Sequence, residues 1–431
     1  MLFKRILLTA AIILLSFNAR ALELTDVYHT LGDAFSSFVD DNEGLTGFRS
    51  LNITSGGREE SLGGAFTGLA DDIGFFDYNP AGSCLLRQGE FAVFHNSWIA
   101  DSNIESIAWA DRFNNLGLGA KIKCFYVPFT EYNYFGNRVA GNYYSETTAC
   151  LNASYNFFKG YYFKGLALGA NLKASWRSVP DYTDNDTDAI IQGSGLAQSA
   201  LAAMADIGAM LTFDALKNFE SREPNLRIGF SALNLGAAFK GFGSQGSFGI
   251  DDPLPSSINA GASYRLFKFL ALSADFSQPL NFQNMSKSGL WSAGAGIDFY
   301  VTDFLEFMAG FRLKGANPRI SLGIEFRIKK FTFDINYTFD LTSSMNPVNR
   351  FSLSARVSLG DHGRKARQER CDDYYTKGLD QYARGNYDAA VEYWRQALKE
   401  DKSFTPAQRW IQTVQGSQKL YDRVLDIQSL D

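Results

Sequence analysis

The residues that most often carry chemistry are few and scattered in this chain. Its three histidines, His29, His95 and His362, have no cysteine or carboxylate at the spacing of a metal-ligand set. The sequence also contains no nucleophile elbow or phosphate-binding loop, because the glycine pairs at 117–119 and 294–296 lie inside alternating segments and lack the helix that follows such a loop. Glycines in that setting more often mark a bend or a site of close packing. We therefore expect no enzyme activity, no metal and no cofactor.

The four cysteines offer a second chemistry, because disulfides form in oxidising compartments. Cys124 and Cys150 flank one predicted hairpin loop. The two side chains should point to opposite faces of the sheet, which argues against a disulfide. Cys124 alternates in phase with the apolar Ile122, whereas Cys150 alternates in phase with the polar Asn152. We expect these two cysteines to be unpaired.

The N-terminus has the pattern of a secretory signal. Lys4 and Arg5 precede the apolar run 6–15, and residues 19–21 read Ala-Arg-Ala, a small-x-small cleavage pattern. We therefore assign residues 1–21 to a signal peptide and exclude them from the fold. No cysteine follows the cleavage site, which argues against a lipid anchor.

Composition limits the remaining classes of protein. After the signal, no stretch of about eighteen apolar residues remains that could form a membrane-spanning helix. Aromatic residues make up 15% of the chain, yet the mean hydropathy is only -0.16, so polar and apolar residues are finely mixed. A net charge of -5 and the lack of a basic stripe argue against a nucleic-acid partner.

From residue 90 to 360 the sequence repeats one pattern, a segment in which apolar and polar residues strictly alternate, followed by a turn. In 350–359, for example, Phe351, Leu353 and Ala355 alternate with Ser352 and Ser354. A period of two predicts β-strands. The predicted strands number fourteen: 90–100, 104–112, 115–127, 143–158, 164–178, 202–213, 225–234, 256–267, 270–279, 289–300, 304–314, 318–329, 331–340 and 350–359.

Two observations favour a transmembrane β-barrel over a large soluble β-sandwich. Aromatic residues lie near strand ends, as an interfacial girdle requires: Phe91, Trp98, Tyr126, Trp176, Phe299 and Tyr300. Short connections also alternate with long ones, which is the outer-membrane pattern of tight periplasmic turns and long external loops. The connections near Ser102, Ala316 and Leu216 depart from that pattern. Charges on the polar phase, such as Lys121, Lys123, Glu325 and Asp334, would face the lumen and could line a channel, although a barrel lumen is polar by default.

An even number of strands places both ends of the barrel on one side, and the short turns assign that side to the periplasm. Residues 22–89 show no alternation and contain glycine pairs and an Asn-Pro step, which require tight turns. A barrel of fourteen strands has a lumen too wide for its own side chains to fill. We therefore predict that 22–89 form a compact plug.

After the barrel the sequence changes character. Residues 361–372 form a polar, basic linker, and 373–431 are rich in helix formers. Five residues have the spacing of a tetratricopeptide helix pair: Gly378, Tyr382, Ala390, Trp394 and Ala397. One repeat normally cannot stand alone, so a third helix or a partner should complete it. The predicted fold class is thus an all-β transmembrane barrel of fourteen antiparallel strands with an N-terminal plug and a small all-α C-terminal domain.

The plug sequence resembles the N-terminal signature of FadL-type outer-membrane transporters, and more closely that of the FadL-like proteins of spirochaetes. The matching residues are Arg58, the run 62–65, the run 70–72 and the run 79–82, and they include Gly63, Gly64, Asp71, Asp72, Asn79, Pro80 and Ala81. The resemblance covers roughly residues 45–360. It implies a fourteen-stranded barrel with a hatch, and hydrophobic ligands such as long-chain fatty acids that bind inside the barrel.

By the same resemblance, loops 179–201 and 235–255 correspond to external loops where a ligand enters. The second loop contains Phe239, Phe242 and Phe248 among glycines, and an ordinary glycine-rich surface loop fits these residues equally well. This chain departs from the family because it continues for about seventy residues after the last strand.

The leading hypothesis is uptake of hydrophobic small molecules across an outer membrane, which requires an apolar cavity behind the plug. The alternative is an outer-membrane anchor or scaffold whose periplasmic helical tail binds a partner protein, as in related barrels of secretion systems, and a general porin comes third. Membrane lipid, a hydrophobic ligand and a periplasmic protein are the expected partners. Both the plug and the C-terminal domain are expected on the periplasmic side.

Overall fold

The computed structural model describes residues 32–99, 101–184, 187, 189–244, 246–341 and 349–428. Its main feature is a closed antiparallel barrel, in which β1 pairs with β15, β6 pairs with β7, and each remaining long strand pairs with its neighbours along the chain. The predicted signal peptide and His29 lie outside the described residues.

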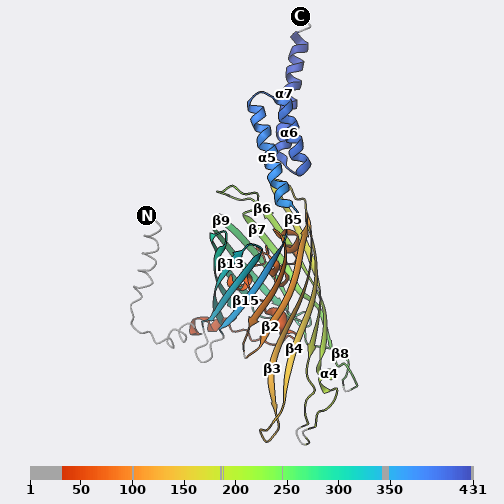
Figure 1. The fold of residues 1–431 in the computed structure, drawn as a ribbon. Helices are drawn as coiled ribbons and strands as arrows, with labels where there is room; N and C mark the ends of the chain where they lie inside the picture. Colours follow the sequence, from red (N-terminus) through yellow and green to blue (C-terminus); the bar gives the residue numbers. More distant parts are fainter. Residues whose placement is uncertain are drawn as a thin grey trace, which may run out of the picture.

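Fourteen long strands form the barrel wall (Figure 1). Their bounds are β1 (Gly89–Ser97), β2 (Asn103–Phe113), β3 (Leu116–Tyr132), β4 (Arg138–Phe157), β5 (Phe163–Ser178), β6 (Ala200–Phe213), β7 (Leu226–Lys240), β9 (Ser256–Phe267), β10 (Leu270–Leu280), β11 (Ser292–Thr302), β12 (Leu305–Lys314), β13 (Asn317–Ile328), β14 (Phe331–Asp340) and β15 (Arg350–Gly360). A two-residue strand, β8 (Gly249–Ile250), pairs with the end of β7.

The alternation of the sequence becomes an alternation of burial. In β14 the apolar residues Phe333, Ile335 and Tyr337 are exposed, whereas Asp334 and Asn336 between them are buried inside. The wall therefore presents apolar side chains outward and polar side chains to the lumen, as a barrel surrounded by lipid requires. The predicted transmembrane barrel is confirmed. Among the described residues no helix is both long and apolar enough to cross a membrane.

The strand bounds differ from the prediction mainly at the long-loop end. The ladder between β3 and β4 continues to Tyr132 and Arg138, so the predicted loop 128–142 shrinks to 133–137. β7 extends to Lys240, where β8 pairs with it. Hydrogen bonding between neighbouring strands does not need an apolar face outside the bilayer, so the ladder continues where the alternation fades.

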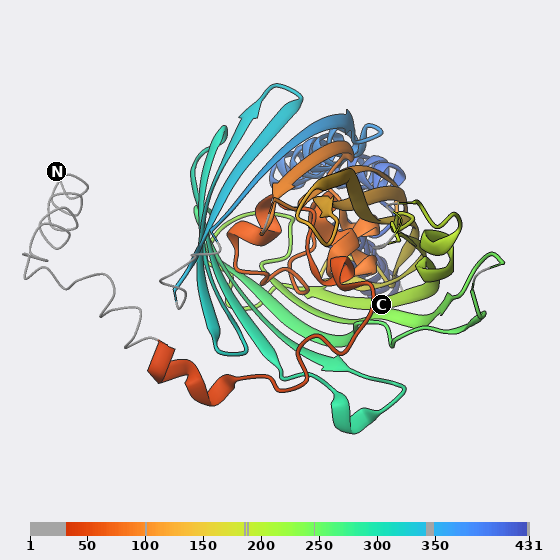
Figure 2. The same cartoon turned by 90° about the horizontal axis from the view of Figure 1, so that it is seen from below.

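The plug occupies the lumen, as Figure 2 shows in a view along the barrel. It contains short helical turns, among them η2 (Arg49–Asn52), α3 (Arg58–Ser61), η3 (Ile73–Asp77) and η4 (Pro80–Leu85). Its first part reaches the long-loop end, where the Asp40 carboxylate accepts from the Leu290 backbone N–H at 2.8 Å. Its last part lies at the other end, where the Cys84 backbone packs on Gly117.

The plug therefore runs through the lumen from the long-loop end to the helix end. The sequence could not show this, because alternation locates the wall but says nothing about the path of an irregular segment.

Three helices follow the barrel at its short-turn end (Figure 1): α5 (Arg364–Ala383), α6 (Tyr387–Glu400) and α7 (Thr405–Gln428). α5 begins inside the segment expected to be a linker, because only residues 361–363 form the turn after β15. The helices contact two barrel connections: the Phe404 ring packs on Tyr161, and Arg222 pairs with Asp372.

The five residues singled out in the helical segment come together in its core. Trp394 is fully buried, and a side chain at Gly378 would collide with its indole ring. The Tyr382 ring lies 6.0 Å from the Trp394 ring. Ala390 and Ala397 are buried in the same cluster. Small residues thus stand where helices touch, and aromatic rings fill the space between them. The tetratricopeptide assignment of this segment stays a prediction.

Candidate functional site

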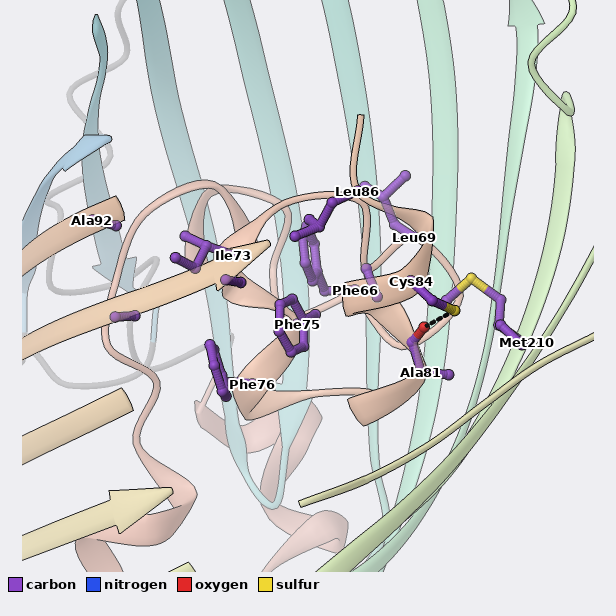
Figure 3. Close-up of a cluster of buried hydrophobic side chains, with 14 of the residues drawn as sticks. Phe66, Leu69, Ile73, Phe75, Phe76, Ala81, Cys84, Leu86, Ala92 and Met210 are labelled. Atoms are coloured by element: carbon purple, nitrogen blue, oxygen red, sulfur yellow. Dashed lines mark hydrogen bonds between the residues drawn. The ribbon is translucent and has the colours of Figure 1, made fainter. Parts of the chain in front are cut away.

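The plug has its own apolar core (Figure 3). Phe66, Phe75 and Phe76 are fully buried, and the rings of the last two are stacked 4.3 Å apart. Cys84 belongs to this core and lies beside Met210 of β6. All four cysteines are free, as expected for Cys124 and Cys150. Wall residues such as Met210 and Met308 belong to the same cluster, so apolar packing also joins the plug to the lumen face of the barrel.

Glycines bring the Gly63–Gly64 turn against the wall. Both residues have positive φ angles, +65° and +78°, which favour glycine. A Cβ atom on Gly310 of β12 would lie 2.1 Å from the Gly63 nitrogen, and one on Gly323 of β13 would lie 2.0 Å from the Ser61 hydroxyl. The wall glycines are therefore sites of close packing, as the sequence suggested for 117–119 and 294–296.

The Asn79-Pro80-Ala81 turn docks on the opposite part of the wall. The Asn79 side chain accepts from the Ala81 backbone N–H at 3.1 Å and donates to the carbonyl oxygens of Thr67 at 2.9 Å and Ala209 at 3.1 Å. A Cβ atom on Gly208 would lie 2.2 Å from the Asn79 side-chain oxygen. Asn79 therefore caps the start of η4. Its other hydrogen bonds join two parts of the plug and attach them to β6.

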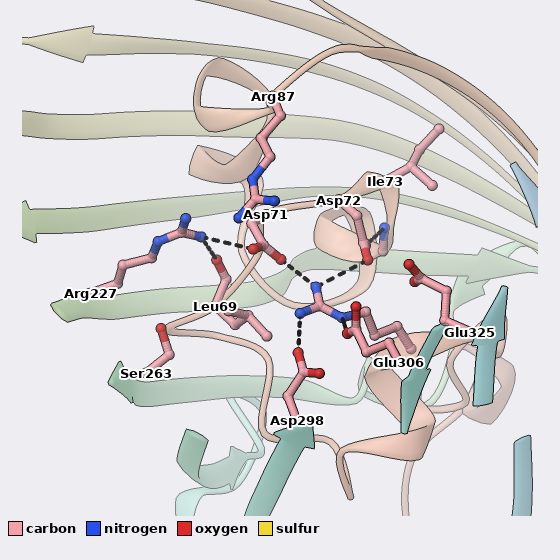
Figure 4. Close-up of polar contacts among 12 residues, drawn as sticks. Leu69, Asp71, Asp72, Ile73, Arg87, Arg227, Ser263, Asp298, Glu306 and Glu325 are labelled. Atoms are coloured by element: carbon pink, nitrogen blue, oxygen red, sulfur yellow. Dashed lines mark hydrogen bonds and ion pairs between the residues drawn. The ribbon is translucent and has the colours of Figure 1, made fainter. Parts of the chain in front are cut away.

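Asp71 and Asp72 both contact Arg58, the side chain that organises the site. Figure 4 labels the four carboxylates around it, Asp71, Asp72, Asp298 and Glu306. Its guanidinium contacts Asp71 at 2.5 Å and Asp72 at 3.5 Å within the plug. It also donates to Glu306 of β12 at 3.1 Å and pairs with Asp298 of β11. All five side chains are buried.

A second buried arginine continues the network from the wall side. Arg356 of β15 contacts Asp72 at 3.0 Å and Asp334 of β14 at 3.0 Å, and it also pairs with Glu325 of β13. Arg227 of β7 lies 3.4 Å from Asp71. Ion pairs to several strands therefore fix one segment of the plug.

The charge of Asp71 follows from these neighbours. Burial raises the pKa of its carboxyl, but Arg58 and Arg227 outweigh burial and lower the pKa below its usual value. The plug carboxylate is thus held in its charged form. It can leave its place only if it stays paired or becomes solvated.

The inward lysines anchor the plug as well. The Lys121 ammonium lies 2.7 Å from the Asp77 carboxylate, and the Lys123 ammonium donates to the carbonyl oxygens of Ser50 and Ile53 at 3.0 and 2.9 Å. The prediction that charges on the polar phase face the lumen is correct for these lysines, and for Glu325 and Asp334. The two lysines contact the plug directly, whereas Glu325 and Asp334 pair with Arg356, which contacts Asp72 of the plug.

Sequence reasoning missed Asp298, Glu306 and Arg356 as partners of the plug. A signal was present, because carboxylates and arginines recur on the lumen phase of consecutive strands near the end of the chain. The assignment of Trp98 to the lipid girdle is wrong, because Trp98 lines the lumen cavity beside Arg350. The same assignment is wrong for Tyr300. Its hydroxyl accepts from Arg58 at 3.0 Å, since it alternates with Phe299 and therefore faces the lumen.

The three phenylalanines of the predicted loop lie together. The rings of Phe239 and Phe248 are stacked 5.9 Å apart, and Phe242 lies 5.7 Å from Phe248 and 5.5 Å from Trp176 of β5. Phe239 neighbours Ala238, which is buried toward the lumen, so the Phe239 side chain lies on the outer face. The cluster is therefore on the outside of the barrel at its long-loop end.

A cavity of about 930 Å³ lies between the plug and the long-loop end. One part of its wall is apolar, with Ile99, Phe125 and Val127. Another part carries Arg312, Arg319 and Arg350, so the apolar cavity expected from the sequence is only partly realised. Among the described residues no group of three or more histidine, cysteine or carboxylate side chains could hold a metal ion.

The fold and the buried network define a class of protein, a transmembrane β-barrel whose lumen is filled by its own N-terminal segment. More particularly, the chain belongs to the uncharacterised protein family UPF0164, whose family model matches residues 29–362. A UPF0164 protein of Treponema pallidum (strain Nichols) is 30% identical over 403 residues, which cover 91% of this chain and 88% of the relative. A second one from the same organism is 26% identical, covering 92% of this chain and 81% of the relative.

Solved structures of similar arrangement are more distant. The P. putida toluene transporter TodX aligns with a TM-score of 0.46 and 11% identity, over 71% of this chain and 98% of TodX. The CymD monoaromatic hydrocarbon channel aligns with a TM-score of 0.49 and 14% identity, over 72% of this chain and 99% of CymD.

Proposed function

We propose that this protein takes up hydrophobic small molecules, such as long-chain fatty acids, across an outer membrane. The observation that carries the proposal is the cavity of about 930 Å³ at the long-loop mouth of a lumen that the plug occupies. A cavity of this size accommodates a small molecule, and the plug prevents free diffusion of water and ions. Ligand binding would then shift the plug toward a conformation that opens a path.

The cavity favours an amphiphilic ligand, with one apolar end and one polar end. Phe125 and Val127 of β3 offer an apolar surface, while the arginine side of the cavity offers hydrogen-bond donors. The aromatic cluster of Trp176, Phe239, Phe242 and Phe248 on the outer face would collect greasy molecules near the mouth. We place the long loops outside the cell and the helices in the periplasm, because short turns lie on the periplasmic side of outer-membrane barrels.

An uptake assay tests this function. Cells that lack their own fatty-acid transporter should accumulate labelled long-chain fatty acid when they make the protein. Asn52 is exposed and lines the cavity, so Asn52→Trp should block the cavity and lower uptake severalfold without disturbing the barrel. Ser286→Trp, on an exposed turn of the β10–β11 loop, is the matched control. Equal uptake with and without the protein would contradict the proposal.

The alternative function is a scaffold whose helical tail binds a periplasmic protein. It is favoured by α7, in which residues 415–420, beyond the buried Val414, are all exposed. Deleting 361–431 separates the two functions. Unchanged uptake with loss of a captured partner would indicate a composite role, whereas no uptake in either form would leave only the scaffold.

A further inference from the structure

Three arginines meet on the lumen side of the barrel at the long-loop end. Arg312 of β12 and Arg319 of β13 are directly opposite each other in the strand register, and Arg350 begins β15. All three line the large cavity. Like charges directly opposite on neighbouring strands destabilise a sheet, so this arrangement calls for a compensating group.

The protein does not supply that group fully. Within the described ranges none of the three arginines forms an ion pair. The Nε atoms of Arg319 and Arg350 are buried without a hydrogen-bond partner. Arg350 is only 6% exposed, and its guanidinium lies over the Trp98 ring at 3.3 Å from the centroid. Stacking on an aromatic face leaves the edge of a guanidinium free to donate.

A fourth donor lies in the same cavity. The Tyr78 hydroxyl is buried and has no hydrogen-bond partner. It lies close to Arg312, because a Cβ atom on Gly64 would be 3.1 Å from the Tyr78 hydroxyl and 3.3 Å from an Arg312 nitrogen. Donors from the plug and from three strands therefore converge on one region.

Two acids face this region, Glu60 of the plug and Asp340 of β14. Asp340 is opposite Arg319 in the register. Burial raises the pKa of the Glu60 carboxyl, although Arg350 and Ser352 oppose that shift. Another acid of the cavity, Glu43, is paired with Arg49. The guanidinium groups are therefore in excess over the carboxylates that face them.

We propose that Arg312, Arg319, Arg350 and Tyr78 bind the phosphate group of an amphiphile whose apolar chain lies along Ile99, Phe125 and Val127. A carboxylate has two oxygens and one charge, which a single arginine can satisfy in bidentate geometry. A phosphate monoester has three terminal oxygens and a charge of about -1.5 to -2, which matches several guanidinium groups. The inference rests on the proposed function, because the ligand enters through this cavity.

Binding to the full-length purified protein in a nonionic detergent tests the proposal. The probes are octyl phosphate, octanoate, octanol and inorganic phosphate, measured by calorimetry. Octyl phosphate should bind at least about ten-fold more tightly than octanoate, because each additional charge-assisted hydrogen bond contributes on the scale of a ten-fold change. Octanol should bind more weakly still. Inorganic phosphate that binds as tightly as octyl phosphate would identify free phosphate as the source of the group.

Variants assign the binding to the cluster. Arg312→Gln and Arg350→Gln should each weaken octyl phosphate binding about ten-fold and change octanol binding little. Arg138→Gln, at an exposed start of β4 outside the cavity, is the matched control and should bind like the wild type. Arg312 is only half-buried, so its variant remains informative if Arg350→Gln does not fold.

Two results would overturn the proposal: equal affinities for octyl phosphate and octanoate, or variants that bind octyl phosphate as well as the wild type. Octanoate and octanol binding that persists in that case would leave the uptake function intact, whereas no binding of any probe together with no cellular uptake would contradict both.

Discussion

Two sets of arginines that face the same lumen have opposite surroundings. Arg58 and Arg356 each contact at least three carboxylates. Arg312 and Arg350 lie in the cavity and form no ion pair within the described part of the chain. A buried charge is costly unless it is paired, so the first set explains how the plug is fixed. The second set has no carboxylate partner among the described residues, and such unpaired cations suit a site that binds a negatively charged group better than a structural role.

The comparison also separates two kinds of wall glycine. Gly310 and Gly323 lie against the plug, where a side chain would collide with Gly63 or Ser61. Gly249 of β8 has open space around its Cα atom. Close packing and ion pairs therefore act on the same plug segment.

The largest effect is expected for Arg58→Ala. The change leaves Asp71, Asp298 and Glu306 buried without their shared cation, which costs about 3–5 kcal/mol. Denaturant unfolding of the protein in lipid vesicles would measure the loss, and protease cleavage within 56–80 would report release of the plug. Arg384→Ala, which removes an exposed pair on α5, should leave both readouts unchanged. A stable Arg58→Ala protein with a protected plug would show that the network does not fix it.

The next effect is expected for Gly310→Ala. The added methyl group would lie 2.1 Å from the Gly63 nitrogen, so the plug or strand β12 must shift at a cost of about 1–3 kcal/mol. Gly249→Ala is the control, since nothing lies within 4 Å of its added Cβ atom. The same unfolding measurement compares Gly310→Ala with Gly249→Ala. Equal stabilities of the two variants would show that close packing at Gly310 does not stabilise the plug.

Acid should weaken the plug within a defined pH range. The pKa of Asp71 is lowered in the folded protein, because Arg58 and Arg227 outweigh the effect of burial. Its contribution to stability is therefore complete above the ordinary aspartate pKa of 3.8 and is lost as the pH falls further. Protease protection of the plug in wild type should decline only below about pH 4, near the ordinary aspartate range. A decline that begins near pH 6 would point to other groups.

The smallest effect is expected for Arg312→Gln. Arg312 faces Arg319 and has no carboxylate partner in the described ranges that its loss would leave unpaired. The substitution should therefore change the unfolding free energy by less than about 1 kcal/mol, in contrast to Arg58→Ala. A large loss of stability would mean that Arg312 has a structural role after all, and the contrast between the two sets of arginines would disappear.

Much of the fold was predictable because the barrel wall obeys a local rule. Period-two alternation located all fourteen long strands, since each side chain is assigned to lipid or lumen by its parity. The wrong assignment of Tyr300 came from ignoring that same parity.

The candidate site was less predictable, because its contacts join residues far apart in the sequence. Arg58 and Asp298 are 240 residues apart, and no periodicity relates them. The motif containing Asp71, Asp72 and Asn79 indicated where the plug is, but not which strands it touches. The cavity arginines were missed because a charged lumen residue has the same pattern whether it anchors the plug or faces a ligand.

The central claim is that the plug closes the lumen, and ion conductance in planar lipid bilayers tests it most directly. The purified wild-type protein should insert without producing the steady current of an open pore, whereas Arg58→Ala should produce such current. Wild-type channels that conduct continuously, like a general porin, would contradict the account.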